Sequence, residues 1–401
     1  MPSVWHLGKF YPPALGGIES HVQALAREQA RLGLEVSVAC VNHAAPDGRD
    51  VTFTALARTS RSEERDGPVR VLRLGRLASV SRLDVAPGVV PLLEALRRAP
   101  PDLVHLHSPN PTMLLALAAR APVSTLVITH HSDVVRQRVL AIGFSVLERR
   151  VYSRAALIFA TSPRYADGSR QLTAMRDRVR SLPLGIDLSP FSRPSEEVQE
   201  HERALRARFG APLWLGVGRL VYYKGYEVAL EALAHAPGKL AVAGTGPLRE
   251  GLERRARALG VADRVAFLGH VPQAELAGAY RAATALWFPS IARSEGYGLA
   301  QVEAMASGCP VINTLLPGSG VPWVSPHERT GLSVPVRDAR ALAAAAARLA
   351  TDSGLRARLS AAAAERATSE LSAEVMGRRC VELYREALEL RERGRPRERT
   401  G

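Results

Sequence analysis

Short apolar runs typical of buried strands alternate with runs of helical period along most of this sequence, and that alternation limits the possible folds. The apolar run Ser3–Leu7 comes first, residues from Ile18 to Leu32 then recur at spacings of three and four, and a second apolar run covers Glu35–Val41. Strand, helix and strand in this order predict a parallel sheet covered by helices. Further predicted elements are strands at Leu103–His107, Thr125–Thr129 and Leu157–Ala160 and a helix near Thr112–Arg120. The first half is therefore predicted to be a doubly wound α/β domain.

The chain has 401 residues, more than one hydrophobic core usually supports. A polar, proline-bearing stretch between Leu184 and Glu202 is interpreted as a linker, because it lacks apolar periodicity. After it come predicted strands at Leu213–Val217, Leu240–Ala243, Val265–Leu268, Ala285–Phe288 and Val311–Asn313, then helices at Ala339–Leu349, Leu355–Ala367 and Ala373–Leu390. We predict domains at residues 1–190 and 191–372, a C-terminal helix at 373–390 that packs back on the first domain, and a disordered tail at 391–401. Two such domains in tandem are expected to place their ligand crevices at the carboxyl ends of the strands, facing each other across a cleft.

The formal net charge of +14 leans toward the first half, where residues 1–180 hold 24 basic and 15 acidic residues. Nucleic acid is not predicted as a partner, because the arginines are dispersed without interleaved aromatic residues. An anionic membrane surface is a predicted partner, since Val134–Arg154 combines spaced apolar residues with arginines that include Arg136, Arg138, Arg149 and Arg150, as in a basic amphipathic helix. The alternative is an ordinary core helix with a solvated arginine face.

No apolar run approaches the roughly 20 residues that span a bilayer. Residues Met1–Lys9 lack the basic, apolar and cleavage-site order of a secretory signal. We interpret the protein as cytoplasmic, with peripheral attachment to the inner face of the cytoplasmic membrane.

The segment from Glu295 to Pro310 carries the strongest functional signal. It follows a predicted strand and runs into a predicted helix, so the backbone N–H groups of Gly298 and Leu299 are expected at a positive helix end that suits an anion. Glu295 precedes that helix, and Glu303 lies about one and a half turns along it, so the two carboxylates are expected to contact different parts of an elongated ligand. The Glu295 carboxylate is expected to have no packing role.

This segment has Gly298-Leu299 after the first glutamate and Glu303-Ala-Met-Ala at the second, and it resembles the signature of the retaining family 4 glycosyltransferases. The resemblance implies an α/β protein of the GT-B fold, with two doubly wound Rossmann-like domains and a nucleotide-sugar donor bound by the second. It covers nearly the whole chain, leaving out Asp47–Asp84 and the last ten or so residues.

Other segments of the second half agree with this resemblance. Arg219 and Lys224, in a glycine-rich stretch after a predicted strand, resemble the basic pair that holds the donor diphosphate. The turn Ala243–Pro247 resembles a second glycine-rich turn of the family, and backbone groups around Val271 lie where the resemblance places the nucleotide base.

Two segments of the first half also match the family. Gly16 and Gly17 resemble its glycine loop, which faces the diphosphate, and glycine lets backbone approach a phosphate closely. His131, rather than His130, matches the family histidine near the transferred sugar, because it follows a predicted strand at the required place.

The resemblance therefore implies a retaining hexosyltransferase with His131 and Glu295 as catalytic residues and no resident cofactor. Stretches at His131–Arg136, Gly218–Gly225 and Gly320–Val324 look closest to bacterial mannosyltransferases of polysaccharide assembly, so GDP-mannose is the preferred donor and a lipid-linked or glycan acceptor is expected. A UDP-sugar donor remains an alternative. No metal is predicted, because the sequence contains no Asp-x-Asp, the pair that commonly gathers a divalent cation at a diphosphate.

Three other protein classes compete with this interpretation. A nicotinamide-dependent oxidoreductase is disfavoured because Arg249 stands where the third glycine of the dinucleotide fingerprint belongs, and the stretch does not follow the first strand. A non-catalytic sugar-nucleotide-binding homologue would keep the fold, but the joint presence of Arg219, Lys224, Glu295 and Glu303 disfavours it. A sugar-nucleotide epimerase differs in needing no acceptor.

Overall fold

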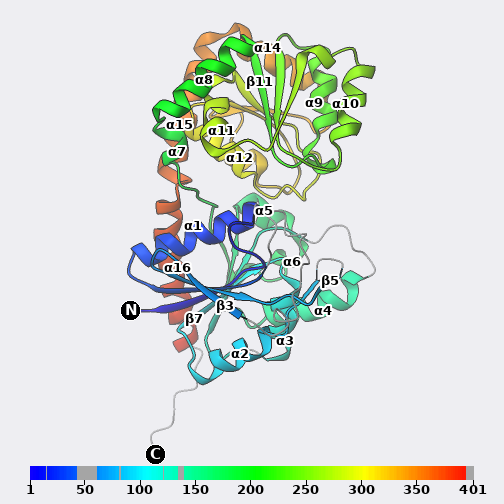
Figure 1. Cartoon of the computed structure of the whole chain (residues 1–401). Helices are drawn as coiled ribbons and strands as arrows, with labels where there is room; N and C mark the ends of the chain where they lie inside the picture. Colours follow the sequence, from blue (N-terminus) through cyan, green and yellow to red (C-terminus); the bar gives the residue numbers. More distant parts are fainter. Residues whose placement is uncertain (15, 43–60, 81–82, 121, 134–139, 394–401) are drawn as a thin grey trace, which may run out of the picture. The chain divides into compact units, whose positions relative to one another are not determined.

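The computed structural model describes residues 1–14, 16–42, 61–80, 83–120, 122–133 and 140–393 (Figure 1). The chain divides into two compact units. Unit 1 comprises Met1–Gly185 and the C-terminal residues from Ala373 onward, and unit 2 comprises Ile186–Ser372. Each unit is a Rossmann-like domain built on a largely parallel sheet, which confirms the predicted α/β class.

Among the described residues of unit 1, the main sheet has the order β10-β9-β8-β7-β1-β2-β4-β3. Its neighbours are parallel except β3, which pairs antiparallel with β4. The strands are β1 Ser3–Leu7, β2 Glu35–Val41, β3 Arg61–Asp66, β4 Val69–Leu74, β7 Leu103–Ser108, β8 Thr125–His130, β9 Leu157–Ala160 and β10 Val179–Ser181, with β5 Ala78–Val80 and β6 Leu83–Val85 forming a separate hairpin. The helices are α1 Gly17–Arg31, α2 Val89–Arg98, α3 Pro111–Ala119, α4 Leu140–Tyr152, α5 Pro163–Gly168, α6 Arg170–Thr173 and α16 Ala373–Arg393.

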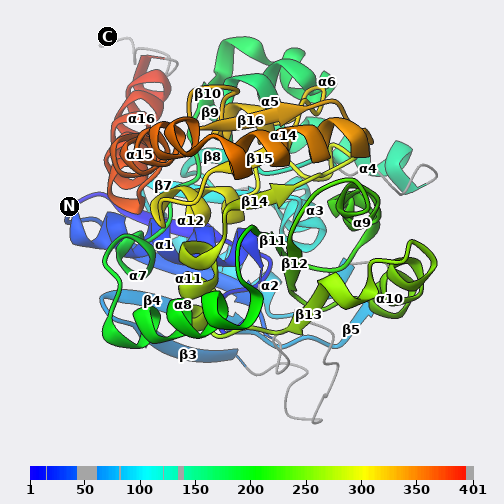
Figure 2. The same cartoon turned by 90° about the horizontal axis from the view of Figure 1, so that it is seen from above.

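Alternation along the strands of unit 1 buries two apolar faces. One face, which includes Val4 and Leu103, packs under α1 and α16, and the opposite face, which includes Leu7 and Leu106, packs under α2 and α3. The last helix of the chain thus belongs to the core of the first unit, next to α1 (Figures 1 and 2). It continues through Arg391, which donates to the Thr125 hydroxyl, so residues 391–393 are helical and the predicted tail is wrong there. The rest of that tail, 394–401, lies outside the described residues.

Unit 2 has the parallel sheet order β13-β12-β11-β14-β15-β16 in the part of the chain that the structure describes. Helices α9, α10 and α14 lie on one side of it and α8, α11 and α12 on the other (Figure 2). The strands are β11 Leu213–Val217, β12 Lys239–Ala243, β13 Val265–Gly269, β14 Ala285–Phe288, β15 Val311–Thr314 and β16 Gly331–Val334. The helices are α7 Ser189–Ser192, α8 Glu196–Phe209, α9 Tyr226–Leu233, α10 Arg249–Ala258, α11 Gln273–Ala282, α12 Leu299–Ala306, α13 Val321–Val324, α14 Ala339–Thr351 and α15 Ser353–Glu370.

The linker interpretation of Leu184–Glu202 is wrong in its second half. Helix α8 begins at Glu196, where the Ser195 hydroxyl accepts a hydrogen bond from the Val198 N–H as an N-cap. A Cβ on Gly278 of α11 would meet the Glu202 backbone nitrogen at 2.9 Å, so the two helices pack backbone to backbone. Helices in such close contact need few apolar side chains between them. Helix α8 therefore lacks the apolar periodicity from which a helix is predicted.

The described residues include no helix that is long and apolar enough to cross a membrane.

Candidate functional site

In unit 2, the predicted site residues follow three strands of one parallel sheet: β11 and β14 are neighbours, and β12 separates β13 from β11. Arg219 and Lys224 come after β11, Val271 after β13, and Glu295 and Gly298 after β14. Because parallel strands end at the same edge of a sheet, these segments share the carboxyl edge, where α/β domains bind ligands. We call this group of segments the unit 2 edge.

Lys224 and Glu295 form an ion pair at the unit 2 edge. The Lys224 Nζ lies 2.6 Å from the Glu295 Oε2, and the two side chains are 13% and 10% exposed. The Lys224 ammonium also lies 4.8 Å from the centre of the Phe288 ring, on β14. The expectation that Glu295 has no packing role is wrong, because its carboxylate is buried and neutralises a buried ammonium. Glu295 is buried because the loop after β14 packs against the loop after β11. The sequence pattern does not show that Glu295 pairs with Lys224.

Gly225 allows the loop after β11 and the loop after β14 to pack closely against each other. Gly225 has φ 72°, and a Cβ there would meet the Pro289 carbonyl oxygen at 2.0 Å, so only glycine fits. The Ile291 N–H donates to the Tyr223 carbonyl at 2.8 Å, which ties the loop after β14 to the one after β11. The basic residues and the glutamate segment are therefore positioned as one piece.

Helix α12 begins at the unit 2 edge without a side-chain cap. Gly298 precedes it with φ 84°, and a Cβ there would meet the Phe288 ring at 2.5 Å. Leu299 is the first helical residue and is half-buried. An uncapped helix start offers backbone N–H groups and positive potential to an anion.

Glu303 lies further along α12 and is held from a different helix. The Tyr280 hydroxyl of α11 donates to its Oε2 at 2.7 Å. Burial raises the pKa of Glu303 above its ordinary value, although the Tyr280 hydrogen bond and the Lys224 charge lower it. This carboxyl is thus separate from the Lys224–Glu295 pair but lies within the electrostatic range of Lys224.

The remaining two predicted residues of unit 2 are more accessible. Arg219 is exposed, and its Nη2 donates to the Tyr223 hydroxyl at a long 3.4 Å. Val271 is half-buried in the loop between β13 and α11. A flexible, exposed guanidinium costs little to redirect toward an anion.

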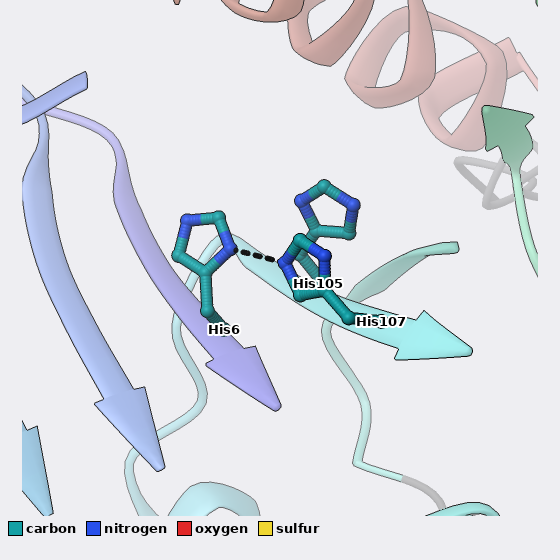
Figure 3. A group of neighbouring side chains, drawn as sticks. All are labelled: His6, His105 and His107. Atoms are coloured by element: carbon teal, nitrogen blue, oxygen red, sulfur yellow. Dashed lines mark hydrogen bonds between the residues drawn. The ribbon is translucent and has the colours of Figure 1, made fainter. Parts of the chain in front are cut away.

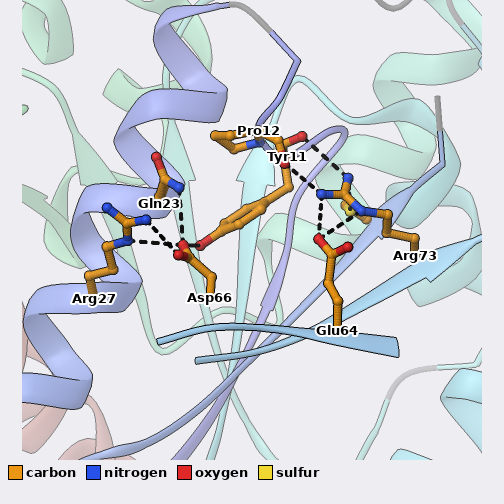
Figure 4. Close-up of polar contacts among 8 residues, drawn as sticks. Tyr11, Pro12, Gln23, Arg27, Glu64, Asp66 and Arg73 are labelled. Carbon is orange, nitrogen blue, oxygen red and sulfur yellow. Dashed lines mark hydrogen bonds and ion pairs between the residues drawn. The ribbon is translucent and has the colours of Figure 1, made fainter. Parts of the chain in front are cut away.

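In unit 1, the loop before Gly16 and Gly17 is clamped by residues from the segment that the resemblance left out (Figure 4). The buried Arg73 guanidinium of β4 donates to the Tyr11 and Pro12 carbonyls at 3.3 and 2.5 Å and pairs with Glu64 at 2.6 Å. The Tyr11 hydroxyl donates to Asp66 at 2.7 Å. Asp66 also accepts from Gln23 and Arg27 of α1, so β3 and β4 fix both the loop and the helix that follows it.

His131 follows β8 and is buried, with 6% of its surface exposed. Its backbone N–H donates to the Ser108 carbonyl, its Nε2 lies 3.2 Å from His107 Nδ1, and its Nδ1 has no hydrogen-bond partner among the described residues. His130 differs, because both its ring nitrogens are engaged, by Tyr152 at 2.8 Å and Asp133 at 2.9 Å. Of the two adjacent histidines, His131 is the one with a buried ring nitrogen that lacks a hydrogen-bond partner among the described residues.

His131 belongs to a cluster of buried histidines under α1 and α16 that sequence reasoning missed. His6 of β1 and His105 and His107 of β7 lie side by side, with a hydrogen bond between His6 and His107 (Figure 3). His21 of α1 completes the cluster, with its ring centre 4.9 Å from that of His131. The two-residue period of the strands places these histidines on one face of the sheet: His6 shares a face with Val4, and His105 and His107 share it with Leu103. Each strand nevertheless has the apolar sequence of an ordinary core strand, so the histidines did not stand out.

Burial keeps these imidazoles neutral at neutral pH. It lowers the pKa of His6 to about 4 and that of His21 to about 3, and it places the pKa of His105, His107 and His131 well below the usual value. Neutral histidines each carry one donor and one acceptor nitrogen. Two groups of three, His6 with His105 and His107, and His21 with His107 and His131, have ring nitrogens within 4.8 Å of one another.

Comparison with known proteins gives the family. The profile described as Glycosyltransferase Family 4 matches residues 15–190, and the profile described as Glycosyl transferases group 1 matches residues 197–366. A 2-deoxystreptamine N-acetyl-D-glucosaminyltransferase from Streptomyces fradiae is 31% identical over 94% of this chain and 92% of its own. The chain belongs to glycosyltransferase family 4.

Two further relatives of this glycosyltransferase differ in the share that matches. An O-antigen chain mannosyltransferase C from Escherichia coli is 27% identical over 84% of this chain and 86% of its own. The D-rhamnosyltransferase WbpZ from Pseudomonas aeruginosa is 34% identical, but the match spans 58% of this chain and only 60% of that protein.

Solved structures confirm the GT-B fold. A sucrose-phosphate synthase from Thermosynechococcus elongatus covers 97% of this chain and all of its own, with a TM-score of 0.78 and 24% identity. HepE from Anabaena, solved with UDP and glucose, covers 96% of this chain and 99% of its own, with a TM-score of 0.74 and 18% identity.

Proposed function

We propose that this family 4 glycosyltransferase moves a hexose with retention of configuration from a nucleotide-sugar to a lipid-linked or glycan acceptor in cell-surface polysaccharide assembly. The observation that carries the proposal is the unit 2 edge, where a buried Lys224–Glu295 pair, the exposed Arg219 and an uncapped helix start come from adjacent strands. Mannose from GDP-mannose is the preferred donor, and the names of the E. coli and P. aeruginosa relatives, a mannosyl- and a rhamnosyltransferase, support a hexose of this kind.

The positive groups of the unit 2 edge stabilise the leaving diphosphate. Negative charge grows on the phosphates in the transition state, and preorganised donors facing that charge lower the barrier. Arg219 supplies a fork for two phosphate oxygens, Lys224 a point charge, and the start of α12 at Gly298 and Leu299 its backbone N–H groups. When the diphosphate attracts Lys224, the Glu295 carboxylate becomes available to the sugar hydroxyls.

The remaining residues hold the other parts of the donor. Glu303, kept in place by Tyr280, holds the ribose, and backbone around Val271 reads the base. In unit 1, the anchored loop at Gly16 and Gly17 approaches the diphosphate, and His131 positions the sugar. Under this proposal unit 2 is the donor domain and unit 1 the acceptor domain.

Charge neutralisation in this scheme needs no divalent metal. The sequence has no Asp-x-Asp pair, and two basic side chains with a helix start are enough to offset the roughly one negative charge that the diphosphate gains on departure.

Two alternatives remain for the donor and the activity. A UDP-sugar is the second candidate donor, supported by the UDP and glucose in the HepE structure. The other alternative is a homologue that binds sugar nucleotides without transferring the sugar.

The test incubates purified protein with GDP-mannose or UDP-glucose, with and without lipid-linked acceptors, and follows nucleotide release and the anomeric configuration of the product. We expect acceptor-dependent GDP release and an α product from the α donor. Arg219→Ala should lower turnover about 100- to 1000-fold, as loss of a transition-state donor does. Arg255→Ala, which removes an exposed arginine of the same unit, should leave it unchanged. UDP release would select the alternative donor, whereas tight donor binding without any acceptor-dependent release would favour the non-catalytic homologue.

We further propose that unit 1 contacts an anionic membrane surface through α4. Among the described side chains of this helix, Val146 is 58% exposed beside the exposed Arg149 and Arg150, while Val151 is buried. Residues 134–139, which contribute to the predicted amphipathic pattern, lie outside the described residues. An exposed apolar side chain next to exposed arginines suits the interface of an anionic bilayer.

A further inference from the structure

Three histidines and a glutamine of unit 1 form a continuous row of hydrogen bonds that ends at His131. Gln29 Oε1 lies 2.7 Å from His6 Nε2, His6 Nδ1 lies 2.9 Å from His107 Nε2, and His107 Nδ1 lies 3.2 Å from His131 Nε2. Gln29, His6 and His107 are at most 1% exposed. We call this row the Gln29–His131 chain.

All the hydrogen bonds in a row of neutral imidazoles must run in the same direction. Each ring has one N–H and one bare nitrogen, so a ring that accepts at one nitrogen must donate from the other. The direction is therefore set at an end where the partner has a fixed role, and Gln29 provides that end.

The Gln29 amide is oriented by α16. Its Nε2 donates to the Cys380 Sγ at 3.3 Å, which leaves its Oε1, an acceptor only, facing His6. His6 must then carry its proton on Nε2 and accept at Nδ1 from His107. His107 in turn carries its proton on Nε2 and accepts at Nδ1 from His131.

We propose that the Gln29–His131 chain locks His131 in the Nε2–H tautomer, so that its Nδ1 presents a bare lone pair. This nitrogen has no hydrogen-bond partner among the described residues, as the proposal requires of an atom reserved for a ligand. The ligand group it accepts from is a hydroxyl. Gln29, His6 and His107 are positioning residues, since they act on the ligand only through His131.

The functional consequence rests on the proposed role of His131 at the transferred sugar. When His131 Nδ1 is fixed as an acceptor, it orients a sugar hydroxyl without reorganisation at the moment of reaction. In the other tautomer, Nδ1 would carry a proton and could not accept a hydrogen bond from this hydroxyl. The low pKa that burial imposes on all three rings keeps the chain neutral, so its direction persists across the neutral pH range.

The tautomer is directly measurable in the donor-free, full-length protein. Two-bond ¹H–¹⁵N spectra of protein labelled with ¹⁵N-histidine distinguish the two neutral tautomers, the imidazolium and metal-bound rings, and His131→Asn identifies the His131 signal by its loss. We expect the Nε2–H pattern for His131, His107 and His6. An Nδ1–H pattern at His131, an imidazolium at pH 7, or a metal-bound signal that a chelator removes would each overturn the proposal. The last outcome would show that His21, His107 and His131 bind a cation instead.

Variants test whether Gln29 sets the direction. Gln29→Leu removes the fixed acceptor, which should shift the His131 tautomer ratio about tenfold toward Nδ1–H and lower transferase turnover by a factor of up to about ten. Thr129→Val is the matched control, because it removes the 2.7 Å hydrogen bond between the Thr129 hydroxyl and His105 Nε2, and the His105 ring stacks on His107 but lies outside the row. If Thr129→Val shifts the ratio as much as Gln29→Leu, general packing sets the tautomer and the proposal is wrong.

Should Gln29→Leu fail to fold, the wild-type spectrum alone still decides the tautomer. Because that spectrum needs no substrate, it also separates the tautomer proposal from the proposed transferase function. The Nε2–H pattern in a protein without transferase activity would refute the proposed function, but the proposal for the His131 tautomer would stand.

Discussion

Replacing Lys224 by methionine should strongly destabilise unit 2 in the absence of any ligand. The ammonium lies 2.6 Å from the Glu295 carboxylate, and the side chains are only 13% and 10% exposed. At an effective dielectric constant of about 20, a pair at this distance interacts by about 6 kcal/mol before desolvation is subtracted. Removing one partner leaves the other charge buried and unpaired, for which about 3–5 kcal/mol is typical.

The size of this effect can be measured by thermal unfolding of single and double variants. A loss of about 3–5 kcal/mol corresponds to a fall in Tm of about 6–20 °C for a domain of this size. Glu295→Leu should cost a similar amount. The double variant, Lys224→Met with Glu295→Leu, has no orphaned charge, so we expect it to recover most of the loss and to give a coupling free energy of at least about 2 kcal/mol.

An ion pair of nearly the same length on the surface of unit 2 provides the control. The Arg255 Nη2 lies 2.7 Å from the Glu231 Oε1, with side chains 45% and 38% exposed, and Arg255→Met should change the free energy of unfolding by less than about 1 kcal/mol. If Lys224→Met behaves like this control and the coupling is near zero, the inference that burial makes the Lys224–Glu295 pair strong is refuted.

Three further predictions follow from the site and the surface. Because the folded-state pKa of Glu303 is raised, its contribution to stability is present below about pH 4.5 and is lost as pH rises through the raised value. In thermal unfolding, Glu303→Gln should therefore become more stable relative to wild type between about pH 4.5 and about pH 7. A difference between the two proteins that stays constant over this pH range would contradict the burial argument. Transfer activity should survive excess chelator, and activity that chelator abolishes and magnesium or manganese restores would show that a metal is required. Co-sedimentation should show binding to anionic vesicles that fades with added salt and weakens in Arg149→Gln/Arg150→Gln, whereas equal binding to neutral vesicles would contradict contact through these arginines.

Much of the fold could be predicted because it depends on local patterns. Strands such as Ser3–Leu7 and Ala285–Phe288 have the predicted bounds, since a buried parallel strand needs a continuous apolar run that any reader of the sequence can find. Helix α8 and the strands β3 and β4 were missed. The first packs through close backbone contact around Gly278, and β3 lies at the sheet edge with the polar sequence Arg61–Asp66, so neither shows a strong apolar period.

The candidate site was predictable in its positions but not in its contacts. Arg219, Lys224 and Glu295 were found from motifs after strands, and sheet order then explains why those motifs meet at one edge. That the last two form a buried ion pair could not be predicted, because pairing depends on how two loops are held by Gly225 and Ile291.

The sequence by itself determined the two α/β domains, the glycine and glutamate motifs and the family, because each depends on residues close together in the chain. Tertiary structure alone decided the burial of Glu295, the clamp that Arg73 places on the loop before Gly16, and the chain from Gln29 to His131. Those contacts join residues far apart in sequence, such as Gln29 and Cys380, which α1 and α16 bring to 3.3 Å. Burial and hydrogen bonding then set charge states and tautomers, which depend on the surroundings of a side chain and not on its place in the sequence.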